Sequence, residues 1–444
     1  MVLSTRCSLA ERQSQPGNSQ DITSTVKLFE AGSLWSYKGF RLFWFSNTIF
    51  VIGAAAFPVA LAVAVLDSNG NDPKSLGFIL GARLLAAILV SPVAGVWADR
   101  LPRTHVMIAA DLFRAALVIS LVFLAISSTP FWVLAAVVFL MGVGDAFGIS
   151  AAAAIMPSLL PEDKLMAGNV ARTIVIRTSS ILGPGVGAGA ILLFGVRQTF
   201  VLTGVLFVIG TSLMFFIKED FKHIAHEDKQ TFFIDLKEGV RTVWRIKWIF
   251  ALITSCSFQL MFIVGVESVL LPVITRREFE TNNVFAISAS VFSLGAIIGA
   301  LISLRLKIKH QGQFCMLVFA LLSTTTLALA FPFSQSIIIG AYFVAGLSVG
   351  PWEAFWAAAV QREVPQQLQG RVFSVDHMGS SALIPLGMVL VGPAAELLGE
   401  KPMLIGVSIL HVLISLSVLK VTGVRDLKMP ASFWNSSQGE QLKR

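Results

Sequence analysis

Ten ionisable side chains interrupt apolar stretches of this chain, and they are the residues whose types could do chemistry. They are Arg83, Asp111, Arg114, Asp145, Arg172, Arg177, Glu267, Glu353, Asp376 and His377. A charged group in apolar surroundings is costly, so each is a candidate functional residue. A buried carboxylate can bind a proton from one side and release it on another. We rank Glu267, Glu353 and Asp145 as candidates for proton coupling or substrate binding, the alternative being an arginine or backbone pair in a packed interface.

The basic residues of this set have other possible partners. Asp111 and Arg114 are three residues apart, which places them on one face of a helix where they can form an ion pair. A structural or gating role is therefore favoured for both. Arg83 could act either in gating or in binding the substrate.

Aromatic residues flank one of the carboxylates. Trp352 and Trp356 stand on either side of Glu353 in the stretch GPWEAFW. Such rings can stack on a flat or cationic ligand. Packing between helices is the alternative use of the same spacing.

The composition is that of a membrane protein. The 444 residues are 55% hydrophobic and only 14% charged, whereas soluble domains carry about 25% charged residues. Apolar segments of about twenty residues, long enough to cross a bilayer as helices, recur along the chain. The alternation of a β-barrel is missing. The sequence therefore predicts an all-α membrane protein.

Punctuation by charges, proline and glycine divides the chain into twelve candidate spans. Their approximate limits are 40–66, 76–98, 105–127, 131–156, 166–194, 197–217, 247–274, 284–306, 313–332, 335–360, 372–398 and 402–421. We expect five parts: a flexible tail (1–37), a six-helix bundle (38–217), a central loop (218–246), a second six-helix bundle (247–421) and a tail (422–444).

The second half of the chain repeats the first at an offset of 204 residues. Matching pairs are Arg41/Arg245, Trp44/Trp248, Gly95/Gly299, Arg103/Lys307, Gly142/Gly346, Pro161/Pro365, Gly183/Gly387 and Gly195/Gly399. The same offset places Asp376 on Arg172, which suggests an ion pair between the bundles. Parallel repeats are typical of secondary transporters with a site between the halves.

The basic residues predict the orientation. With the N-terminus inside, 25 Lys and Arg residues fall on the cytoplasmic side and five on the other side. Cytoplasmic loops carry such an excess. We therefore expect both termini to lie in the cytoplasm. We also expect the chain to be a multi-pass protein of the inner (cytoplasmic) membrane. The net charge of +8 follows from this bias, so nucleic-acid binding is not indicated.

The loop after the second span carries a known motif. The stretch GVWADRLPR supplies Gly95, Ala98, Asp99, Arg100 and Arg103, and it resembles the loop between the second and third helices of the major facilitator superfamily. Pro102 stands where that motif usually has glycine. A small residue such as Gly95 allows close helix approach.

In that family the charged loop is thought to latch the two bundles together. By this resemblance, Gly95, Asp99, Arg100 and Arg103 act in gating, together with Asp111 and Arg114. The alternative is a loop that only obeys the positive-inside rule.

The fifth span carries a second motif. SSILGPGVGAG supplies Gly183, Pro184 and Gly187 and is similar to the antiporter motif of the same superfamily. The proline bends the helix and the glycines permit tight packing. A purely structural kink is the alternative. Together with PSLLPEDKLMAGN and AADLFRAA, the chain resembles the branch of drug, macrolide and siderophore exporters.

This resemblance implies export of a small amphipathic compound by proton antiport with alternating access. The alternatives are a proton-coupled importer of a nutrient and a membrane sensor or lipid-handling protein that does not transport. The chain has no nucleotide-binding loop with Lys-Ser/Thr and no metal-ligand spacing. We therefore expect a monomeric protein that is not an enzyme, needs no cofactor or metal, and works with protons, a small substrate and the bilayer.

Overall fold

The computed structural model describes residues 33–428 except 69, 125–128 and 220–238. The expected tails lie mostly, and the central loop largely, outside these residues. The first group of α-helices comprises α1 (Lys38–Ser68), α2 (Pro73–Arg100), α3 (Arg103–Leu124), α4 (Phe131–Ala154), α5 (Met156–Leu159), α6 (Leu165–Phe194) and α7 (Val196–Met214). The second comprises α9 (Lys247–Phe279), α10 (Asn283–Ser303), α11 (Gln311–Phe319), α12 (Ser323–Ala330), α13 (Gln335–Glu363), α14 (Gln366–Ser381), α15 (Ile384–Leu398) and α16 (Glu400–Val418).

Twelve stretches of the described chain are helical, long and apolar enough to cross a membrane. They coincide with the twelve expected spans, so the predicted fold class is confirmed. The ninth span consists of α11 and α12 joined by a short 3-10 helix, Ala320–Leu322. The eleventh consists of α14 and α15, which are separated just before Pro385. Pro385 has no N–H to donate to the carbonyl group four residues earlier, that of Ser381, which accounts for the end of α14 there.

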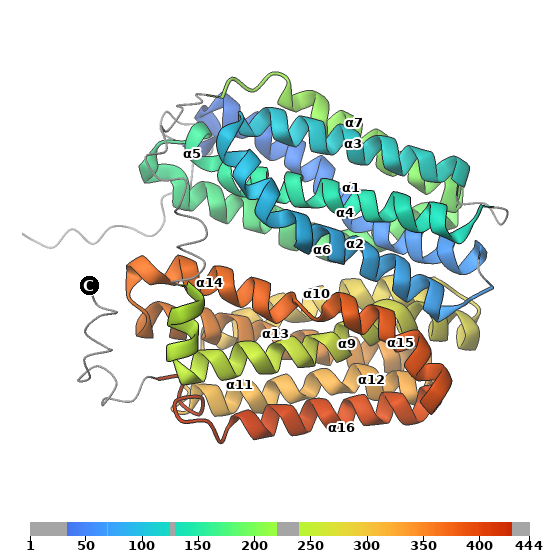
Figure 1. The fold of residues 1–444 in the computed structure, drawn as a ribbon, viewed down its shortest axis with the longest axis vertical. Coiled ribbons are helices and arrows are strands. Elements are labelled where there is room, and N and C mark those ends of the chain that lie inside the picture. The colour runs from blue at the N-terminus through green and yellow to red at the C-terminus, as the bar shows by residue number, and fades with distance from the viewer. Residues whose placement is uncertain (1–32, 69, 125–128, 220–238, 429–444) are drawn as a thin grey trace, which may run out of the picture.

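The helices form two halves (Figure 1). The N-terminal half contains α1–α7 and the C-terminal half contains α9–α16, and the same neighbours recur in both. Helix α1 packs on α6 and α7 as α9 packs on α15 and α16, and α2 packs on α4 as α10 packs on α13. The repeat inferred at an offset of 204 residues is thus a repeat of helix packing.

Two glycines show this repeat in the backbone itself. Gly195 and Gly399 have φ angles of 85° and 82°, and each immediately precedes the last helix of its half. Only glycine adopts this conformation at low cost. The same turn is therefore built twice, 204 residues apart.

The halves meet where α2 contacts α15 and α6 contacts α10. Close backbone approach explains one glycine of α2, since a Cβ on Gly77 would overlap the carbonyl oxygen of Met388 in α15. Two ion pairs, Asp67–Arg276 and Lys74–Glu396, join the halves at the same end of the molecule. We call this the paired end.

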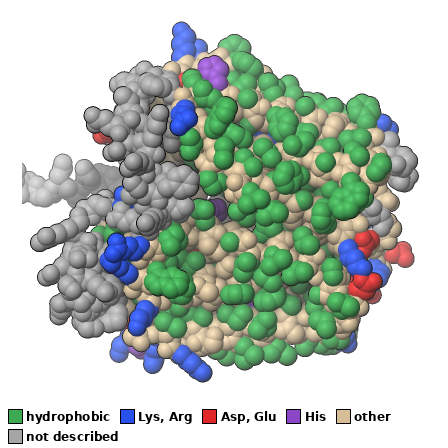
Figure 2. Space-filling model, viewed as in Figure 1, with side chains coloured by type: hydrophobic (Ala, Val, Ile, Leu, Met, Phe, Trp, Pro, Cys, Tyr) green, Lys and Arg blue, Asp and Glu red, His purple; other side chains and the backbone are tan. Residues whose placement is uncertain are grey.

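The outer surface fits a bilayer. Figure 2 shows a face covered by hydrophobic side chains, with Lys and Arg gathered at the left end and both signs of charge at the right end. Large exposed residues such as Leu192, Leu193 and Leu397 are more than 70% exposed on this apolar exterior. Exposed aliphatic surface of this extent is stable in lipid rather than in water. Which end faces the cytoplasm remains the prediction made from the basic residues.

Candidate functional site

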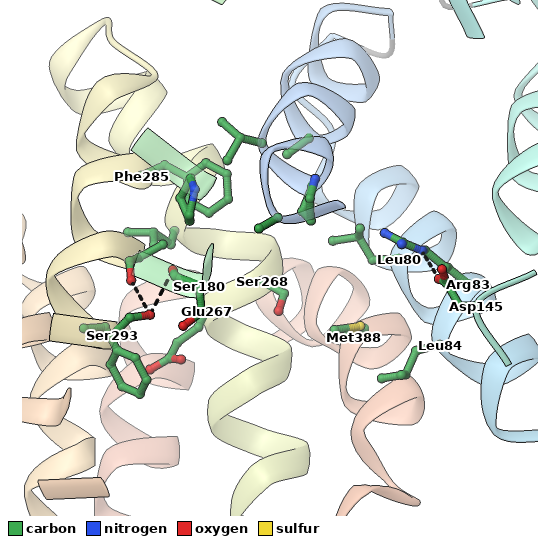
Figure 3. Close-up of a pocket in the computed structure, with 18 of the residues that line it drawn as sticks. Leu80, Arg83, Leu84, Asp145, Ser180, Glu267, Ser268, Phe285, Ser293 and Met388 are labelled. Atoms are coloured by element: carbon green, nitrogen blue, oxygen red, sulfur yellow. Dashed lines mark hydrogen bonds and ion pairs between the residues drawn. The ribbon is translucent and has the colours of Figure 1, made fainter. Parts of the chain in front are cut away.

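A cavity of about 530 Å³ lies between the two halves. Its walls are mainly apolar and come from both halves, from α2 and α6 of the N-terminal half and from α9, α10 and α15 of the C-terminal half (Figure 3). The charged side chains that line it are Arg83, Asp145 and Glu267. Most pockets for small molecules combine apolar walls with a few placed polar groups in this way.

Asp145 on α4 is held by two arginines. Its Oδ2 accepts a hydrogen bond from Arg83 Nε at 2.9 Å, and its Oδ1 accepts one from Arg114 Nη1 at 3.1 Å. Arg114 also pairs with Asp111, as predicted from their spacing. The two carboxylates and two guanidinium groups form one network without net charge, so Asp145 is an ion-pair residue rather than an unpaired acid.

The glycines around Asp145 make room for this network. A Cβ on Gly148 would overlap Nη2 of Arg114, and a Cβ on Gly144 would lie 2.7 Å from Cγ of the same side chain. The guanidinium carbon of Arg114 also lies 4.2 Å from the ring centre of Phe50. Gly144 and Gly148 therefore mark the space into which Arg114 is packed.

A second cavity, of about 390 Å³, lies within the N-terminal half. We call it the N-half chamber; Arg83, Asp111, Arg114, Asp145 and Arg172 line it. The buried Nε of Arg172 on α6 has no hydrogen-bond partner among the described residues. Its expected ion pair with Asp376 is not formed, because Asp376 lies in a separate cavity and is bonded elsewhere.

Glu267 on α9 lies at the border of two cavities. It lines the cavity between the halves and also a third cavity. Its Oε1 is buried and has no hydrogen-bond partner among the described residues. Two arginines neutralise Asp145, but no described Lys or Arg forms an ion pair with Glu267. The carboxylate of Glu267 is therefore available for a proton or a ligand.

The third cavity, of about 450 Å³, is lined only by the C-terminal half, and we call it the C-half chamber. Trp352 and Trp356 stack there with ring centres 5.9 Å apart and planes 20° apart. Trp356 Nε1 donates to Asp376 Oδ2 at 2.8 Å. Glu353 lines the same chamber. The structure thus brings Asp376 to the stretch that contains Trp352, Glu353 and Trp356.

The loop expected to act as a latch is arranged within one half. The carboxylate of Glu219 accepts hydrogen bonds from the backbone N–H groups of Arg103 and Thr104, at 3.1 and 2.8 Å, at the first turn of α3. An acid at a helix N-terminus is favoured by the helix dipole. Arg100 is exposed, and the side chain of Asp99 lies outside the described part of the structure. Sequence reasoning missed Glu219, which lies two residues after the predicted end of the sixth span.

Gly95 corrects one expectation. A Cβ built on it would meet nothing within 4 Å, so none of the described helices packs closely against it in this conformation. Its repeat partner Gly299 does approach a neighbour, since a Cβ there would overlap the carbonyl oxygen of Leu347. The end of α2 that carries Gly95 is therefore free of the contact for which a glycine would be needed.

The fifth-span motif packs as its composition suggests. A Cβ on Gly183 would overlap that of Ala55 in α1, and a Cβ on Gly187 would lie 2.7 Å from the carbonyl oxygen of Ala56. Pro184 lies inside α6 and lines the cavity between the halves. The motif therefore combines tight packing of α6 against α1 with a wall of this cavity.

Three further contacts between the halves were not expected from the sequence. They are the ion pairs of the paired end and the hydrogen bond from Ser293 Oγ on α10 to the carbonyl oxygen of Ser180 on α6, at 3.1 Å (Figure 3). The charges of the paired end are visible in the sequence between spans. Their pairing is not, because the partners are separated by 209 and 322 residues.

The fold and this central cavity define a membrane transporter. The profile of the Major Facilitator Superfamily matches residues 43–388. The chain belongs to this superfamily, as the two sequence motifs suggested.

Curated relatives include exporters. The chain is 26% identical over 377 residues to macrolide efflux protein A of Streptococcus pyogenes. The aligned region covers 82% of this chain and 91% of that protein. It is 26% identical to the putative bacilysin exporter BacE of Bacillus subtilis over 74% of this chain and 82% of that protein. It is also 26% identical to the multi-drug resistance efflux pump PmrA of Streptococcus pneumoniae, over 80% of this chain and 87% of that protein.

Solved structures share the fold at low sequence identity. The nucleoside transporter NupG superposes with a TM-score of 0.67 at 10% identity, over 86% of this chain and 98% of that chain. A peptide transporter POT in complex with sulfate superposes with a TM-score of 0.67 at 14% identity, over 88% and 96%. These likenesses concern the fold alone.

Proposed function

We propose that the chain exports a small amphipathic compound across the cytoplasmic membrane by proton antiport. The curated relatives named as efflux proteins support the direction of transport. The apolar walls of the cavity between the halves support an amphipathic substrate. On this proposal the protein works without a resident cofactor and draws its energy from the proton gradient.

Transport proceeds by alternating access, in which the two halves rock around the central cavity. In this conformation the halves are tied by Asp67–Arg276 and Lys74–Glu396 at the paired end. The open space around Gly95 lies near the opposite end of α2. With the predicted orientation, the paired end is the outer end, and on this proposal the substrate enters the cavity from the opposite, cytoplasmic end.

Glu267 carries the proton in this scheme. Its carboxyl group lies in the cavity between the halves and forms no ion pair with a described Lys or Arg, and this is the observation on which the proposal rests. When the cavity faces outward, Glu267 binds a proton, which removes a charge that would be costly to enclose. When the cavity faces the cytoplasm, the proton leaves and the carboxylate is free for the next cycle. Asp145 cannot take this role easily, because both of its oxygens are held by arginines.

The test is transport into everted membrane vesicles with an imposed pH gradient. A panel of amphipathic compounds is offered to wild type, Glu267→Gln and Glu267→Asp. We expect Gln to lower gradient-driven accumulation at least ten-fold while exchange of substrate for substrate continues, because exchange needs no net proton movement. Asp should retain part of the driven transport.

The exposed acid Glu162 provides a matched control, since it lies outside the cavities. Glu162→Gln should transport as wild type does. Full gradient-driven accumulation by Glu267→Gln would exclude this residue as the proton carrier. Accumulation in right-side-out vesicles instead of everted ones would reverse the proposed direction.

A further inference from the structure

The charges that line the two half-chambers differ in sign. The N-half chamber contains three arginines, and both of its carboxylates are bound by them. The C-half chamber is lined by the carboxyl groups of Glu267 and Asp376 together with one histidine, and neither lysine nor arginine is among the described residues that line it. A cation is therefore attracted to the C-half chamber and repelled from the N-half chamber.

The carboxyl group of Asp376 is held at the wall of this chamber by two neutral donors. Its two oxygens accept hydrogen bonds from Trp356 Nε1 at 2.8 Å and from Ser380 Oγ at 2.9 Å. Both donors are neutral, so they fix the carboxylate in place without cancelling its charge. This arrangement is the reverse of that at Asp145, where the donors are two guanidinium groups.

Aromatic rings complete the chamber. The stacked pair Trp352 and Trp356 lines it, and Phe319 packs against Trp352 with ring centres 5.4 Å apart. Indole faces attract cations, most strongly where water is excluded. No Lys or Arg of the described chain lies over either of these indoles, whereas Arg83 and Arg114 lie over phenylalanine rings of the other half. The indole faces are thus not already used by a cation of the protein.

We propose that the C-half chamber is the subsite for the cationic group of the substrate, which is an amphipathic monocation. The inference rests on the proposed function and adds the charge and position of the substrate. The cation lies between Asp376 and the Trp352/Trp356 pair. The apolar body extends past Glu267 and Phe292, which line both this chamber and the cavity between the halves.

Binding of two similar probes to the purified protein in detergent tests this subsite by equilibrium dialysis. Tetraphenylphosphonium is a lipophilic cation, and triphenylphosphine oxide is a neutral compound of related shape. We expect wild type to bind the cation at least ten-fold more tightly than the neutral compound. Asp376→Asn should reduce that preference to less than three-fold, and Asp376→Glu, which keeps the charge, should preserve most of it.

Trp352→Leu should weaken binding of the cation more than binding of the neutral probe. Monodisperse gel filtration and retained binding of the neutral probe show that each variant is folded. If Asp376→Asn keeps the full preference of wild type, or if wild type has no preference, the subsite is overturned.

The two proposals fail separately. Loss of cation preference in Asp376→Asn, together with full driven transport by Glu267→Gln, supports the subsite and refutes proton coupling through Glu267. An unchanged preference in Asp376→Asn, together with loss of driven transport in Glu267→Gln, overturns the subsite and leaves the proton carrier in place.

Discussion

Lys74 of α2 and Glu396 of α15 form an ion pair that joins the two halves of the transporter. Asp67 and Arg276 form a second such pair at the same end. Exposed ion pairs each contribute up to about 1 kcal/mol. Together they therefore bias, but do not lock, the closure of the paired end.

Removal of both pairs should open this end more often. In Glu396→Gln/Arg276→Gln we expect the ratio of closed to open molecules to fall about five-fold, which corresponds to about 1 kcal/mol. Distances between spin labels at positions 71 and 283, in a background without the native cysteines, measure the two populations. The charge swap Lys74→Glu/Glu396→Lys serves as the control and should stay closed. An unchanged distance distribution in the double variant would show that the pairs do not hold this end.

Asp145→Asn should destabilise the N-terminal half. The substitution leaves Arg83 without its acidic partner in a largely buried position, and breaking a buried pair costs about 3 kcal/mol. We expect a clear drop in the Tm of the protein in detergent. Asp163→Asn, at an exposed position, is the control and should keep the wild-type Tm. A wild-type Tm for Asp145→Asn would mean that the network contributes little to stability.

Two glycines of α2 should respond differently to the same change. Gly77→Ala places a methyl group on the carbonyl oxygen of Met388, so α2 and α15 must separate and the paired end should be less often closed. Gly95→Ala meets open space, and its free energy of unfolding should stay within about 0.5 kcal/mol of the wild-type value. Thermal unfolding and the spin-label distances distinguish the two. Equal effects of both substitutions would contradict the packing described for α2.

Asp99→Asn tests the latch that the family resemblance implies. If the carboxylate helps to close the end opposite the paired end, its loss should lower transport turnover and enrich the conformation described above. Turnover in vesicles and the spin-label distances measure both effects. Arg100→Gln shows whether loss of a neighbouring loop charge has the same effect. Normal turnover with normal populations in Asp99→Asn would remove this residue from the gate.

Much of the fold could be predicted because membrane-spanning helices have a recognisable composition and length in the sequence. Each span must be apolar over about twenty residues, so the twelve helices follow from composition and punctuation alone. The repeat was also visible, since Gly195 and Gly399 are required by the same positive φ in each half. The ion pair of Asp111 and Arg114 could be predicted from helical spacing, because residues three positions apart lie on the same face of a helix.

Contacts between distant helices could not be predicted in this way. The sequence ranks Glu267, Glu353 and Asp145 together as intramembrane acids, but only packing shows that two arginines from α2 and α3 meet Asp145 and none of the described ones pairs with Glu267. Likewise, only the crossing of α13 and α14 brings Trp356 to Asp376. The sequence by itself determined the helices, their duplication and which charges must be accommodated, because these depend on local hydrophobicity and spacing. The tertiary structure decided which charges are neutralised and which remain available, because that depends on which helices lie side by side.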